Sequence, residues 1–128
     1  MGAGDAGARK RRRLSRSGEF DRVYREGSSH ATRYLVLYSF PRAEGDTADV
    51  RLGVSASRKV GGAVERNRVK RALREAFWSL PESLPDGHDF VLVARPAIGE
   101  LVAREGTPGV RGCIEAALAG ATGRERST

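Results

Sequence analysis

Alternating apolar and polar residues predict a β-strand over Ala48–Ser57. The apolar positions are Val50, Leu52, Val54 and Ala56, and the positions between them are small or polar: Arg51, Gly53, Ser55 and Ser57. One face of this strand is therefore expected to be buried, and the other face either is solvated or lines a groove. Two further apolar runs, Tyr34–Phe40 and Phe90–Ala94, predict one strand each.

Helical spacing of apolar residues marks three other segments. Ser17–Glu26 places its apolar residues on one face and precedes a glycine, which is common after the end of a helix. The second helix begins after a Gly-Gly pair and ends before Pro81, and its apolar stripe consists of Val69, Leu73, Phe77 and Leu80. The third helix begins at Thr107, because a Thr cap followed by Pro is a typical helix start.

The predicted order of elements is α-β-β-α-β-α, which is typical of an α+β two-layer sandwich with helices packed on a small sheet. We expect a single domain over residues 17–122, a basic flexible arm over residues 1–16 and a disordered tail over residues 123–128. No apolar run approaches the length of a membrane span, so we expect no membrane contact. Cys113 is the single cysteine, which excludes an internal disulfide and favours a reducing compartment, the cytoplasm.

Positive charge is concentrated around the second predicted helix. Residues 58–74 hold seven Lys or Arg side chains against one acid, Glu65, in a chain whose net charge is +7. Arg66, Lys70 and Arg74 are spaced by four and share one face, which destabilises a helix by roughly a few tenths of a kcal/mol per like-charge pair. A solvated helix face is the ordinary alternative, but such a face usually mixes both signs of charge. A polyanionic partner would offset the repulsion, so we expect this helix to bind nucleic acid.

The sequence contains no grouping of residues that is typical of a catalytic or metal site. His30 and His88 lie in predicted loops and have no partner at metal-ligand spacing. The acidic residues are dispersed, and Ser55 and Ser57 have no base nearby in the sequence. We therefore predict a protein that binds nucleic acid and supplies no catalytic residue and no metal ligand.

The stretch from Arg51 to Phe77, RLGVSASRKVGGAVERNRVKRALREAF, closely resembles the signature of the bacterial ribonuclease P protein subunit. The centre of that signature, R-N-R-x-K-R-x-x-R-E, is similar to Arg66–Glu75 here. Asp89–Pro96 also resembles a later strand of the family. The resemblance implies a four-stranded sheet with a left-handed βαβ crossover, although such crossovers are almost always right-handed.

The resemblance also implies a function in tRNA processing. The family's protein is a subunit of a ribonucleoprotein endonuclease that removes the 5′ leader from precursor tRNA. Its partners are therefore the catalytic RNA subunit and precursor tRNA, and the catalytic Mg²⁺ ions are held by the RNA. No protein-bound cofactor is expected, which agrees with the absence of a recognisable active site.

Two groups of residues correspond by position to the family's RNA contacts. The residues expected to bind the catalytic RNA are Arg66, Asn67, Arg68, Lys70, Arg71 and Arg74. The residues expected to line a cleft for the single-stranded leader are Phe20, Tyr24, Ser55, Ser57, Arg58, Lys59 and Arg95. Such a cleft needs cations and aromatic faces on which bases can stack. Phe20 and Tyr24 also fit an ordinary helix-to-sheet core, and the hydroxyl of Tyr24 makes it the better candidate for exposure.

Two alternative functions remain at this point. The first is a free-standing RNA-binding module of the translation machinery, which would not need the R-N-R-x-K-R pattern. The second is a metal-dependent protein nuclease, which would cleave RNA without an RNA subunit.

Overall fold

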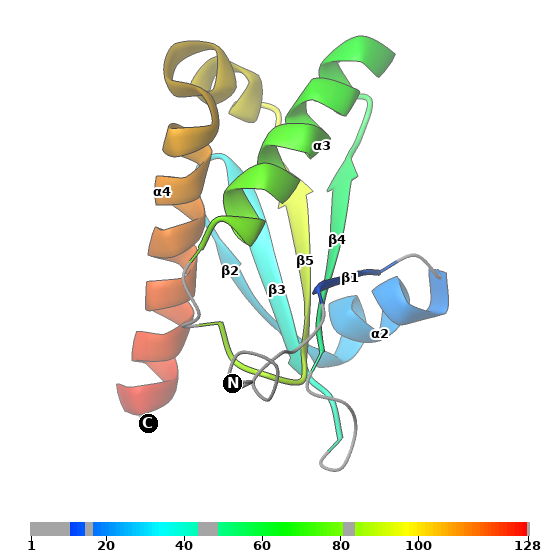
Figure 1. Ribbon diagram of the computed structural model, residues 1–128, viewed down its shortest axis with the longest axis vertical. Helices are drawn as coiled ribbons and strands as arrows, with labels where there is room; N and C mark the ends of the chain where they lie inside the picture. The colour runs from blue at the N-terminus through cyan, green and yellow to red at the C-terminus, as the bar shows by residue number, and fades with distance from the viewer. Residues whose placement is uncertain (1–10, 15–16, 44–48, 81–83, 128) are drawn as a thin grey trace, which may run out of the picture.

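A computed structural model describes residues 11–14, 17–43, 49–80 and 84–127. A mixed five-stranded sheet carries helices on both faces, which confirms the predicted α+β class (Figure 1). The predicted two-layer arrangement is wrong by one layer, because the first helix packs on the face opposite the other two. The elements are β1 (Arg11–Arg13), α2 (Ser17–Glu26), β2 (Ser28–Ala31), β3 (Leu35–Pro41), β4 (Val50–Ala56), α3 (Ala63–Trp78), β5 (His88–Ala94) and α4 (Ile98–Ser127).

The strands are arranged in the order β1-β4-β5-β3-β2. Strands β1, β4 and β5 are parallel, whereas β3 runs antiparallel to β5 and β2 runs antiparallel to β3. The expected number of four strands is wrong by one. Neither β1 nor β2 was predicted from the sequence, because Arg11–Arg13 has no apolar residue and Ser28–Ala31 is mostly polar and exposed.

The connection from β4 through α3 to β5 is left-handed, as the family resemblance implied. Figure 1 views the sheet from the side of α3, where the arrowheads of β4 and β5 point the same way and β5 lies to the left of β4. A right-handed connection would place β5 to the right. This arrangement brings α3 over β4 and leaves the polar side of α3 beside the β1 edge of the sheet.

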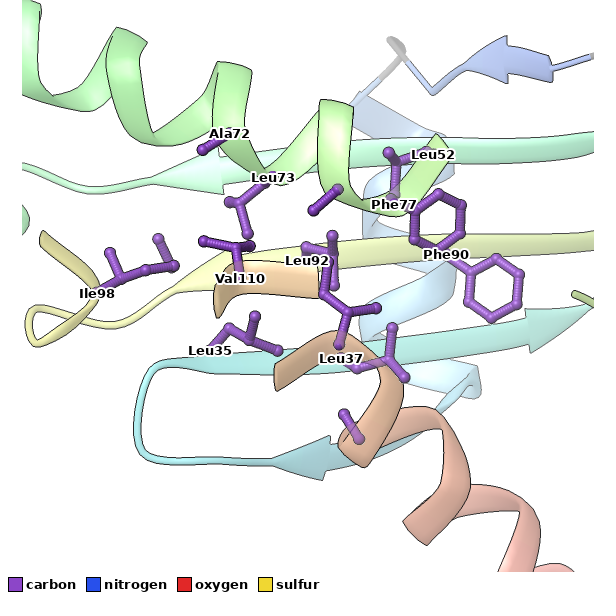
Figure 2. Packing of buried hydrophobic residues seen from close by; sticks show 14 of the residues in the cluster. Leu35, Leu37, Leu52, Ala72, Leu73, Phe77, Phe90, Leu92, Ile98 and Val110 are labelled. Atoms are coloured by element: carbon purple, nitrogen blue, oxygen red, sulfur yellow. The ribbon is translucent and has the colours of Figure 1, made fainter. Parts of the chain in front are cut away.

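The main core lies between the sheet and helices α3 and α4. The predicted stripe of α3 is buried, and its Leu73 and Phe77 point toward Leu92 and Phe90 of β5 (Figure 2). The rings of Phe77 and Phe90 lie 5.3 Å apart, with their planes inclined at 55°. A smaller cluster on the opposite face packs α2 against the sheet through Leu14, Val23 and Val91. Helix α3 is therefore fixed by its apolar side, and its cations face outward.

The structure differs from the prediction in the segments on either side of the predicted domain. Arg11–Arg13 pairs with Val50–Leu52 through backbone hydrogen bonds, so this part of the predicted flexible arm is a strand. Residues 1–10 lie outside the described residues. Helix α4 continues to Ser127, so the tail predicted to be disordered from Gly123 is helical as far as that residue.

Helix α4 begins at Ile98, nine residues before the predicted Thr107 start, and bends at Gly106. Gly106 has φ 65° and ψ −157°, a conformation that is strained for residues with a side chain. The Thr-Pro start predicted the segment after this bend, whereas the segment before it was not predicted from the sequence.

Candidate nucleic-acid interface

The basic side of α3 forms the wall of an open groove of about 530 Å³. Its lining residues are Arg13, Val64, Asn67, Arg68, Lys70, Arg71 and Arg74. Five of the six residues predicted to bind the catalytic RNA therefore line one groove. The sixth, Arg66, is half-buried, and its Nε atom has no hydrogen-bond partner within the described part of the chain. The described residues that line the groove include five cations and no acid, which suits a polyanion.

Arg13 is a member of this groove that the sequence analysis missed. It lies on β1, an element that hydrophobic patterning does not reveal. The pKa of Arg74 is lowered by its burial and further by the positive charge of Arg13. The two guanidinium groups therefore lie close enough to repel each other. By contrast, the neighbouring Arg12 forms an ion pair with Asp49, with Nε 2.6 Å from Oδ2.

A second hollow of about 320 Å³ adjoins the first at the edge of β4. It is lined by Arg13, Leu14, Phe20, Leu52, Val54, Lys70 and Arg74. Three cations, Arg13, Lys70 and Arg74, line both hollows. The predicted basic helix and the aromatic residue Phe20 of α2 are thus parts of one continuous surface.

On the other face of the sheet, the structure brings Tyr24 of α2 together with Ser55 of β4. The Tyr24 hydroxyl forms a hydrogen bond with the Ser55 side chain, and burial raises the pKa of this hydroxyl above its ordinary value. Tyr24 nevertheless remains 39% exposed. Its ring meets Tyr38 of β3 edge-on, with ring centroids 5.0 Å apart. Tyr38 was not predicted as a site residue, because β3 carries bulky residues on both faces.

Phe20 combines the two roles that the sequence left open. Its ring covers Gly53, where an added Cβ would lie 2.5 Å from the Phe20 Cζ atom. It packs against the cluster of Leu14, Val23 and Val91, and it is half-buried. The remaining part of its ring lines the smaller hollow. Close packing therefore explains why glycine occupies position 53 on the otherwise polar face of β4.

The other predicted cleft residues lie where β4 and β5 end. Ser57, Arg58 and Lys59 form an exposed turn, in which the Ser57 carbonyl accepts a hydrogen bond from the Val60 N–H. Arg95 follows β5 directly, and the pairing of the two parallel strands places it at the same end of the sheet. Its Nη1 donates to the carbonyl of Thr32 at 2.9 Å. The residues predicted to form the cleft therefore lie in two groups, an aromatic group near α2 and a cationic group at the strand ends.

A buried ion cluster ties α2 to the sheet. Asp89 is completely buried and accepts two hydrogen bonds from Arg51, of 2.7 and 2.8 Å. Arg42 and Arg22 donate to the same carboxylate, at 2.5 and 3.4 Å. Arg51 also pairs with Glu19 of α2 at 3.0 Å. Asp89 was not predicted as part of an ion cluster, because its partners lie up to 67 residues away in the sequence.

The residues that the structure describes contain no group of three or more His, Cys, Asp or Glu side chains that could hold a metal ion. Among the helices of these residues, none is both long enough and apolar enough to cross a membrane.

Comparison with known proteins identifies close relatives. A family model of ribonuclease P matches residues 8–116. The ribonuclease P protein component of Bacillus cereus strain B4264 is 37% identical over 97 residues, which cover 76% of this chain and 83% of that protein. The ribonuclease P protein component of Bacillus anthracis strain CDC 684 is 36% identical over 97 residues, with coverages of 76% and 80%.

Solved structures share the fold. The RNase P protein of Staphylococcus aureus matches with a TM-score of 0.72 and 33% identity, over 85% of this chain and 94% of that chain. The RNase P protein of Thermotoga maritima matches with a TM-score of 0.69 and 31% identity, over 82% of this chain and 94% of that chain. A mutant of the S. aureus RNase P protein matches with a TM-score of 0.74 and 33% identity, over 86% of this chain and 87% of that chain. This mutant is described as defective in mRNA degradation activity.

Proposed function

Since this chain belongs to the ribonuclease P protein family, we propose that it binds both the catalytic RNA and the single-stranded 5′ leader of precursor tRNA. The proposed reaction is removal of that leader. In this proposal the catalytic Mg²⁺ ions are held by the RNA subunit, and the protein acts in the cytoplasm without a bound cofactor. The free-standing translation module is set aside, because the family assignment accounts for the R-N-R-x-K-R pattern.

The observation that carries the proposal is the continuous cationic surface from α3 to the edge of β4. Its larger groove is lined by Asn67, Arg68, Lys70, Arg71 and Arg74, and none of the described lining residues is acidic. Phosphate groups would neutralise this charge and release counterions, which is the main source of affinity in nucleic-acid binding. We assign the catalytic RNA to this surface.

The leader is assigned to the opposite face of the sheet, at Tyr24, Tyr38 and Ser55. Aromatic rings that are partly exposed offer stacking surfaces for unpaired bases, and a hydroxyl offers a hydrogen bond. The cations Arg58, Lys59 and Arg95 at the strand ends would contact the leader backbone. Single-stranded RNA is the ligand that uses both kinds of group.

A second candidate is a nuclease activity of the protein itself. It is favoured by the description of the S. aureus mutant, which attributes an mRNA degradation activity to that protein. Incubation of the purified protein with precursor tRNA and Mg²⁺, with and without the catalytic RNA of the same organism, separates the candidates. We expect cleavage at the leader junction only when the RNA subunit is present. Cleavage by the RNA-free protein at a comparable rate would contradict the proposal.

A further inference from the structure

We propose that the hollow at the edge of β4 binds one unpaired nucleotide, with its phosphate among Arg13, Lys70 and Arg74 and its base against Phe20 and Val54. This inference rests on the proposed RNA-binding function and adds a site that joins the two RNA-binding faces. The nucleotide belongs either to the catalytic RNA or to the leader, and the experiments below distinguish these sources.

The end of β1 creates the hollow. Strand β1 pairs with β4 only as far as Arg13 opposite Leu52, and the Leu14 N–H then donates to the Leu52 carbonyl at 2.9 Å. Strand β4 continues to Ala56, beyond the last residue of this pairing. Helix α3 borders the space on one side with Lys70 and Arg74, and α2 borders it on the other side with Phe20. Its volume of about 320 Å³ falls at the lower end of the ~300–1,000 Å³ typical of small-ligand sites.

The hollow has an apolar floor beneath a cationic rim. Leu14 and Leu52 are buried, and Phe20 and Val54 are half-buried, so all four present carbon atoms to the space. Among the described residues that line the hollow, these three cations are the only charged ones. A nucleotide combines a flat base, which the floor can hold, with an anionic phosphate, which the rim can hold.

The rim is crowded with like charge in the absence of an anion. The side chain of Arg74 is partly buried and lies within the field of Arg13, and both effects disfavour its charged form. A phosphate between Arg13 and Arg74 would replace this repulsion by two charge-assisted hydrogen bonds.

The floor favours an unpaired nucleotide over a duplex. In a helical stem the bases are stacked and paired, so a stem would present only its phosphates to the rim and leave the floor unused. A base that is free of its stack can lie against Phe20, as bases do on aromatic residues of proteins that bind single strands.

Substitution of Arg13 tests the rim, with Arg12 as a matched control. Arg12 and Arg13 are exposed neighbours on β1, but Arg12 pairs with Asp49 and does not line the hollow. We expect Arg13→Ala to weaken either protein binding to the catalytic RNA or holoenzyme binding to leader-bearing precursor tRNA. The loss should be about four- to fivefold at 0.15 M salt, the effect of one phosphate contact. Arg12→Ala should leave both affinities unchanged, and both variants should melt like the unmodified protein.

The affected equilibrium identifies the RNA that supplies the nucleotide. Loss of affinity for the catalytic RNA assigns the nucleotide to that subunit, and loss confined to precursor tRNA with a leader assigns it to the leader. Unchanged affinities for Arg13→Ala, or an equal loss for Arg12→Ala, would overturn the inference. Arg68→Ala separates this failure from that of the proposed function, because Arg68 lines only the larger groove.

Cross-linking in the assembled holoenzyme tests the base contact. Val54→Cys, in a Cys113→Ser background, carries a thiol-linked photo-cross-linker at the floor of the hollow, and Arg68→Cys in the same background is the positive control. We expect the Val54→Cys variant to cross-link to an unpaired nucleotide. Cross-links only to paired stems, or none while the Arg68→Cys variant does cross-link, would show that no base enters the hollow.

Discussion

Asp89 of β5 binds three arginine side chains. They are Arg22 of α2, Arg42, which directly follows β3, and Arg51 of β4. Its carboxylate is completely buried, and the side chain of Arg42 is only 3% exposed. Removing one partner from a buried ion cluster leaves charges without compensation, which costs ~3–5 kcal/mol. We therefore expect Asp89→Ala to lower the free energy of unfolding by about that amount, as measured by urea denaturation.

The matched control for this prediction is Asp21→Ala, which removes an exposed carboxylate from α2. Its effect should stay within about 0.5 kcal/mol, as for most surface substitutions. If the two variants were equally stable, the ion cluster would not hold α2 in place, and another contact would have to position Tyr24.

Tyr24 is the residue at which leader binding can be separated from stability. Tyr24→Ala removes a stacking surface worth about 1–3 kcal/mol per base. Holoenzyme affinity for precursor tRNA with a leader of several nucleotides should fall by that amount, while affinity for mature tRNA should change little. Tyr24→Phe keeps the ring and loses only the hydrogen bond to Ser55, so it should retain most of the affinity.

A thermal melt of each Tyr24 variant is the control for folding. If Tyr24→Ala melts normally and the affinities for both tRNAs fall equally, the assignment of Tyr24 to the leader is wrong. The ring would then belong to the packing against Tyr38 or to the contact with the RNA subunit.

At the scale of elements, α3 supplies most of the charge that is assigned to the catalytic RNA. Each phosphate neutralised contributes roughly −0.7 to −0.9 to the slope of log affinity against log salt concentration. Replacing Arg68, Lys70 and Arg71 together by Ala should therefore make this slope shallower by about two to three units, if each contacts one phosphate.

Arg111→Ala is the control for the loss of one positive charge outside the groove. Arg111 lies on α4, where its Nε is 3.6 Å from Glu115, and it does not line the groove. Its replacement should leave the slope unchanged. An unchanged slope for the triple variant as well would place the RNA-binding surface elsewhere.

Helices and strands could be predicted where their apolar side chains recur with the period of the element. The stripe of Val69, Leu73 and Phe77 predicted α3, because burial of one helix face imposes a period near 3.6. The family resemblance predicted the left-handed crossover, which the general rule for such connections would have reversed. Strands β1 and β2 could not be predicted, because backbone pairing holds these short and mostly polar segments at the two edges of the sheet.

At the scale of the whole molecule, the predicted site residues fall on different faces and become connected only through the fold. The cations of α3 could be recognised because they are close together in the sequence. Arg13 and the partners of Asp89 could not, because strand pairing brings together residues that are distant in the chain. Tyr38 was missed for a similar reason, since its contact with Tyr24 depends on how α2 crosses the sheet.

The leader dependence of substrate affinity tests the central claim most directly. The affinity for precursor tRNA with a leader is divided by the affinity for mature tRNA, first with the catalytic RNA alone and then with the protein added. Because the protein is assigned a contact with the leader as well as with the RNA subunit, this ratio should rise when the protein is present. A ratio that stays the same with and without the protein would contradict the account.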